Sequence, residues 1–206
     1  YLTPHDYIRE RLLATGPATI PHAIYVHLYR PVLERRIGSG INVMEQDWDN
    51  LIILDACRAD YLREHSTIDG EMSTVVSKGS WSGDFAVKNF QDGNYHDTIV
   101  ITANPHYHRR AHIEEDKFFK LNYVEAEDDN GRPGPRQVTE AAISEIENHP
   151  KKRAIIHYMQ PHAPHVGETA DRFREPFENE SFQGHLMFRL FKSGVISKET
   201  LKQSYI

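Results

Sequence analysis

Side chains that could take part in catalysis follow the apolar runs of this sequence at several points. The residues concerned are Asp55, Ser77, Ser80, Ser82, Asn104, His106, His108, His162 and His165. A carboxylate can bind a hard divalent cation, and a serine hydroxyl can be activated as a nucleophile. Histidine can contact an anionic group or transfer a proton near neutral pH. The residue types therefore suit metal-assisted transfer of an anionic group.

Most of these residues also have an ordinary structural interpretation. Asp55 can be a metal ligand, or it can cap a helix over residues 58–65. The serines can bind an anion at a helix start, or they can be turn and capping residues. His162 lies between two prolines that fix the backbone, which suits a ligand-contacting group or a plain surface turn. His157 lies inside an apolar run, and we expect it to be a hydrogen-bonded core histidine.

Short apolar runs alternate with helical segments from residue 48 onward. Strands are expected at 50–54, 73–76, 97–102 and 153–159, with 117–124 as a strand or the end of a loop. Helices are expected at 58–65, 83–90, 135–149, 182–192 and 197–205. The alternation predicts an α/β fold, a mostly parallel sheet with helices on both faces, in which strand 50–54 is buried on both faces. Ligands of such sheets bind outside the carboxyl ends of the strands, which is where the polar residues fall.

The beginning of the sequence has a different pattern. Residues 4–14 and 20–36 read as two helices, the second weakened by Pro31 and ended by Gly38. We therefore expect an N-terminal helical extension over 1–40 and an α/β domain over 41–206.

Composition excludes several classes of protein. The chain has 206 residues, of which 39% are hydrophobic, so a packed core is expected rather than disorder. Cys57 is the only cysteine, which excludes a disulfide scaffold. The net charge of -6 argues against a nucleic-acid partner. No apolar stretch is long enough to span a membrane, and without a recognisable leader a cytoplasmic location is the default expectation.

Four segments together resemble the sulfatase-like branch of the alkaline phosphatase superfamily, in particular its archaeal-type members. They are WDNLIILDACRADYL (48–62), KGSWSGDF (78–85), DTIVITANP (97–105) and IIHYMQPHAPH (155–165). The resemblance implies that Asp55 binds a divalent metal and that Ser82 is the nucleophile and a further metal contact. It also implies that His162 contacts the transferred group and that Arg58 and Asn104 help to bind the substrate. Cys57 lies in CRADY, which does not fit the C-x-P-x-R or C-x-A-x-R motif of formylglycine sulfatases, so we expect it to be a packing residue.

Two departures from the family pattern bear on the predicted function. The residues after Ser82 are GDF, where true sulfatases have Pro-Ser-Arg, and a T-x-D-H-G-like motif is absent. The domain is therefore expected to be incomplete at its C-terminal side, as a fragment or as a shortened relative. The leading expectation is a metal-dependent hydrolase or transferase (Ca, Mg, Mn or Zn) that acts on sulfate or phosphate esters of small molecules or glycans through a serine. The alternative is a catalytically degenerate relative that binds anionic glycans or a protein partner.

Overall fold

The structure is a computed structural model that describes residues 32, 38, 40–109, 113–126, 133–162, 165, 167–174 and 186–204. The predicted helices at 4–14 and 20–36, and with them the N-terminal extension, lie almost wholly outside these residues.

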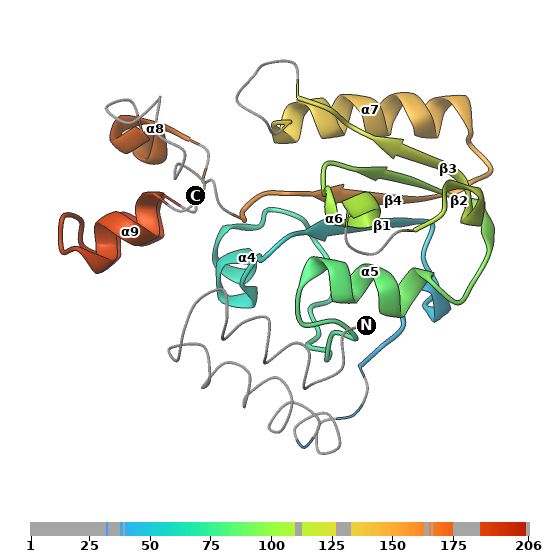
Figure 1. Cartoon of the computed structure of the whole chain (residues 1–206), viewed down its shortest axis with the longest axis horizontal. Helices are drawn as coiled ribbons and strands as arrows, with labels where there is room; N and C mark the ends of the chain where they lie inside the picture. Colours follow the sequence, from blue (N-terminus) through green and yellow to red (C-terminus); the bar gives the residue numbers. More distant parts are fainter. Residues whose placement is uncertain are drawn as a thin grey trace, which may run out of the picture.

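A four-stranded parallel sheet forms the centre of the described chain (Figure 1). Its strands are β1 (Asn50–Leu54), β2 (Tyr95–Thr102), β3 (Phe118–Tyr123) and β4 (Arg153–Tyr158), in the spatial order β1-β4-β2-β3. All three neighbouring pairs are parallel, which confirms the predicted α/β fold. The apolar runs at 50–54, 97–102 and 153–159 are strands as predicted, and 117–124 is a strand rather than a loop end.

Two helices cover opposite faces of this sheet, α5 (Ser82–Phe90) and α7 (Pro135–Asn148). Successive strand residues point to opposite faces. Val100 therefore packs in the core under α5, whereas Ile99 and Ile101 pack in the core under α7. The alternation confirms the prediction of helices on both faces.

The remaining helices are short. They are η3 (Val43–Glu45), α4 (Ala59–His65), α6 (His106–Arg109), η4 (Glu115–Lys117), α8 (Glu168–Arg174), α9 (Leu186–Lys192) and α10 (Lys198–Gln203). The Nδ1 atom of His165 lies 2.7 Å from the hydroxyl of Ser204, just after α10. This buried contact ties the end of the described chain to the segment that follows β4.

Two sequence predictions about strands are wrong. Residues 73–76 do not form a strand. Within the described part of the chain, the one ladder contact next to them is a single parallel bridge between Ile41 and Ser77, where the Ile41 N–H donates to Val76 O at 2.9 Å. Val75 and Val76 are exposed, so their β-branched side chains have no pleated neighbour to pack against. The second wrong prediction is that strand β1 is buried on both faces. It is the edge strand of the described sheet, and α7 packs on β4 and β2 instead. Ile52 of β1 is therefore 58% exposed.

Candidate active site

Four of the five predicted site residues, Asp55, Ser82, Asn104 and His162, meet at the carboxyl edge of the sheet. Asp55 follows β1 directly, and its backbone N–H still donates to Tyr158 O of β4 at 3.2 Å. The next residue, Ala56, has φ 59°, a left-handed conformation that is unusual for a residue with a Cβ. The chain therefore turns sharply away from the sheet immediately after the carboxylate.

One oxygen of the Asp55 carboxylate accepts two side-chain hydrogen bonds from distant parts of the chain. The Ser82 hydroxyl donates to Oδ2 at 2.8 Å, and the Asn104 amide donates to the same oxygen at 3.0 Å. Only 14% of the Asp55 side chain is exposed, so these bonds compensate a largely desolvated charge. Asp55, Ser82 and Asn104, each predicted from sequence to be a site residue, thus form one network.

Asn104 is fixed at both ends of its amide. While its Nδ2 donates to Asp55, its Oδ1 accepts from the His106 backbone N–H at 2.9 Å. The backbone N–H of Asn104 also donates to the Thr102 hydroxyl at 3.0 Å. The side chain is fully buried. A substrate contact for Asn104 stays a prediction of the family resemblance, whereas in the structure its amide holds Asp55 in place.

A buried tyrosine and histidine lie behind Asp55. The Tyr107 hydroxyl is 3.1 Å from His157 Nδ1, and His157 Nε2 is 3.9 Å from Asp55 Oδ2. Burial, and secondarily the Asp55 charge, raise the pKa of Tyr107, so its hydroxyl keeps its proton. Tyr107 can then donate to Nδ1 of His157. The favoured tautomer of His157 therefore carries its proton on Nε2, which faces the Asp55 carboxylate. His157 is thus the hydrogen-bonded core histidine expected from sequence, but it also borders the site.

The His157 environment predicts a loss of stability in acid. Burial lowers the pKa of His157 from its ordinary 6.5 to about 4, although the Asp55 charge opposes that effect. Between these two values the unfolded chain binds a proton that the folded chain does not, so the free energy of unfolding falls as pH falls from 6.5 to 4. The group contributes a loss of about 3 kcal/mol over that range. Urea unfolding of the wild type and of His157→Asn at several pH values measures this change in the free energy of unfolding. If that free energy depended on pH in the same way for both proteins, the effect could not be assigned to His157.

The loop before α5 brings Ser82 to Asp55 by folding back tightly on the helix. A Cβ on Gly79 would lie 2.3 Å from the backbone N of Phe85, so only glycine fits there. The carboxylate of Asp84 accepts from the Ser80 N–H at 3.0 Å. The Ser80 hydroxyl is 3.5 Å from the same carboxylate, and the Ser77 hydroxyl accepts from the Gly79 N–H at 3.3 Å. Of the three candidate serines, Ser82 is the one bonded to Asp55.

A cavity of about 500 Å³ opens over this network. Asp55, Ser82, His157 and His162 all contribute to its wall, together with His106, whose ring lies edge-on to Trp81 with ring centroids 5.4 Å apart. The structure therefore brings the predicted His162 to the same cavity as Ser82. The cavity is large enough for a small ester.

Arg58 does not line that cavity. Its side chain is 63% exposed, donates from Nε to Asp60 Oδ1 at 2.9 Å, and lies over the Tyr61 ring. The paired guanidinium lowers the pKa of Asp60 to about 2. The predicted substrate contact of Arg58 thus finds no support in its position beside Asp60, and the residue lines a neighbouring cleft instead.

The donors around Asp55 fall short of what a divalent cation needs. Ca²⁺ takes about six to eight oxygen ligands, Mg²⁺ about six including waters, and Zn²⁺ about four nitrogen, sulfur or oxygen ligands. Asp55 supplies one carboxylate, one of whose oxygens already accepts two hydrogen bonds. Within the described ranges, no three His, Cys, Asp or Glu side chains are placed to share a metal ion. The metal implied by the resemblance therefore does not fit the donors of this part of the chain alone.

Sequence reasoning missed Tyr107. No motif marks this residue, and its role depends on a contact with His157 across 50 positions of sequence. His157 itself was expected to be in the core, and the signal that could have placed it near the site is its position close to the end of β4.

Among the described helices none is long and apolar enough to cross a membrane. Comparisons of the chain with protein-family models, with curated proteins and with solved structures found no match, so the likeness to sulfatase-like proteins rests on the four sequence segments.

Proposed function

We propose that this protein hydrolyses or transfers phosphate or sulfate esters, with Ser82 as the nucleophile. The observation that carries the proposal is the 2.8 Å hydrogen bond from the Ser82 hydroxyl to Asp55 inside a cavity at the carboxyl edge of a parallel sheet. A serine bonded to a carboxylate can lose its proton as it attacks. Ser82 is also the first residue of α5, and the dipole of a helix favours an anion at its N-terminal end.

The first step forms a bond from Ser82 Oγ to the phosphorus or sulfur of the ester and breaks the bond to the alcohol oxygen. The serine proton passes to Asp55, and the alcohol oxygen takes a proton from His162, which lines the same cavity. In the second step water, or the hydroxyl of an acceptor, attacks the seryl ester and releases Ser82. The returning proton reaches the serine from Asp55, and the attacking oxygen gives its proton to His162.

Asn104 and His157 act on Asp55 rather than on the ester. The Asn104 amide fixes the carboxylate oxygen that faces Ser82, and the His157 Nε2 proton faces the same oxygen. Both are positioning residues in this proposal. No step passes through a metal, because the described donors around Asp55 do not by themselves complete a metal site.

The test is hydrolysis of aryl phosphates, phosphodiesters and aryl sulfates by the chain and by Asp55→Ala, in EDTA and with added Mg²⁺, Ca²⁺, Mn²⁺ or Zn²⁺. We expect the wild-type chain to turn over one of these esters, and Asp55→Ala to do so more slowly by a factor on the order of 10² or more. Asp92→Ala, which removes an exposed carboxylate beyond α5, is the matched control and is expected to keep wild-type activity. Turnover in EDTA supports Asp55 as the proton acceptor, whereas strict metal dependence would make it a ligand that acts with others outside the described residues.

A catalytically degenerate protein that binds anionic glycans or a partner is the second candidate. The incomplete metal donor set favours it, since related chemistry is expected to need that metal. Binding of a sulfated glycan to the chain, with no ester turned over under any condition above, would support this candidate and overturn the first.

A further inference from the structure

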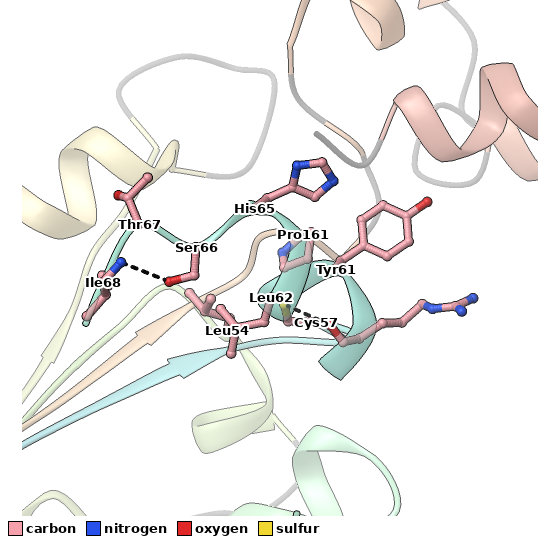
Figure 2. A pocket seen from close by; sticks show the side chains of 10 residues that line it. Leu54, Cys57, Tyr61, Leu62, His65, Ser66, Thr67, Ile68 and Pro161 are labelled. Atoms are coloured by element: carbon pink, nitrogen blue, oxygen red, sulfur yellow. Dashed lines mark hydrogen bonds between the residues drawn. The ribbon is translucent and has the colours of Figure 1, made fainter. Parts of the chain in front are cut away.

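A second cleft adjoins the cavity that holds Ser82 (Figure 2). It has a volume of about 380 Å³ and lies between α4, the segment after α4, and Pro161. Leu54, Leu62 and Pro161 lie together in it, with Ile68 toward one end and Tyr61 toward the other. The cleft is therefore lined mainly by apolar side chains.

The cleft and the cavity share a wall. Leu54 lines both of them, and the residue after it is Asp55. Pro161 lines the cleft, and the residue after it, His162, lines the cavity. A group attached to an ester bound at Ser82 therefore meets this cleft when it extends past the ends of β1 and β4.

The apolar side chains of the cleft are unusually exposed. Ile68 is 82% and Leu62 40% exposed, and α4 contributes no buried residue to the core of the described chain. The apolar side of α4 faces the cleft instead, as the positions of Tyr61 and Leu62 show. A ligand that filled the cleft would remove this apolar surface from water.

The cleft is also close to electrically neutral. The guanidinium of Arg58 is paired with Asp60, and burial together with the Asp60 charge raises the pKa of the Cys57 thiol, which therefore stays uncharged. Among the described residues that line the cleft, Arg58 carries the only permanent charge, and Asp60 offsets it. The lining suits an uncharged apolar group.

We infer that this cleft binds the alcohol part of the substrate, and that the preferred esters are those of apolar alcohols such as alkyl-substituted phenols. The inference rests on the proposed function, because it takes Ser82 as the site where the ester group is held. If the cleft has this role, the apolar alcohol group, rather than the phosphate or sulfate group, determines which esters the protein prefers.

The experiment compares phenyl and 4-butylphenyl esters of whichever class is turned over, since the two phenols have nearly the same acidity. We expect kcat/KM to be about tenfold higher for the butylphenyl ester. Leu62→Glu, which puts a charge on the cleft wall, is expected to bring that ratio close to one, and Leu62→Met to keep it. Val195→Glu is the matched control, because it places the same charge at an exposed apolar position after α9.

Calorimetric titration with 4-butylphenol, the alcohol alone, separates the two proposals. Saturable binding that Leu62→Glu weakens about tenfold and Val195→Glu leaves unchanged supports the cleft. Turnover without any butylphenyl preference, or binding that Leu62→Glu does not alter, overturns the cleft inference and leaves the proposed function standing. Binding of the alcohol with no turnover of any ester overturns the proposed function and the assignment of the cleft to its substrate.

Discussion

Replacing Ser82 with alanine is expected to lower turnover of the active ester by a factor on the order of 10³ or more, because it removes the nucleophile itself. The overall structure should persist, since the lost hydrogen bond to Asp55 lies at the edge of the sheet and the helix begins at the same position. Initial rates together with a thermal unfolding curve measure both quantities.

Ser80→Ala is the control for that substitution. Ser80 is two residues earlier in the same loop, and its hydroxyl lies 3.5 Å from Asp84 rather than near Asp55. We expect it to keep turnover within a few-fold of the wild type. If Ser80→Ala abolished turnover and Ser82→Ala did not, the assignment of the nucleophile would be wrong by two positions.

Phe90→Ala is expected to lower the free energy of unfolding by about 3 to 5 kcal/mol. Phe90 is fully buried at the end of α5, and its ring stacks on Tyr107 with centroids 5.7 Å apart and contacts Phe118 edge-on at 5.6 Å. The substitution leaves a cavity directly beneath the tyrosine that contacts His157. Urea unfolding followed by circular dichroism gives the change.

The matched substitution is Phe191→Ala, on α9, where the ring is 38% exposed. Its expected cost is about 1 kcal/mol or less. Equal losses for the two variants would show that the aromatic cluster around Phe90 does not anchor α5, and with it the start of the helix at Ser82.

Most of the fold follows from patterns that are visible in the sequence. The apolar runs that became β1, β2 and β4, and the amphipathic stretch that became α7, carry their periodicity locally, so their type and position could be predicted. The run at 73–76 was wrongly predicted as a strand because a strand needs a pairing partner, and the described residues provide only a single bridge at the neighbouring Ser77. The exposure of β1 could not be foreseen, since it depends on which strand lies at the edge.

The candidate site, like the fold, could be predicted from the sequence only in part. The meeting of Asp55 and Asn104 could be predicted from the rule that polar residues after parallel strands share one edge. Ser82 reaches the same edge from the start of α5, after a segment that is not a strand. The position of Arg58 could not, because its nearest opposite charge, Asp60, is two residues away and holds it outside the cavity. The part played by Tyr107 depends on how α6 packs against the sheet, which no local pattern encodes.

The position of β4 between β1 and β2 has a consequence for synthesis of the protein. The ribosome releases β1 and β2 before β4, yet in the described sheet neither of these strands pairs with the other, and β1 pairs with β4 alone. A nascent chain that ends before residue 153 would therefore contain the apolar strand β1, which precedes Asp55, before its pairing partner β4 has been synthesised. Such unpaired strands are prone to aggregation. Assembly of Asp55, Ser82 and Asn104 is thus expected to occur late, after the β4 residues have left the exit tunnel.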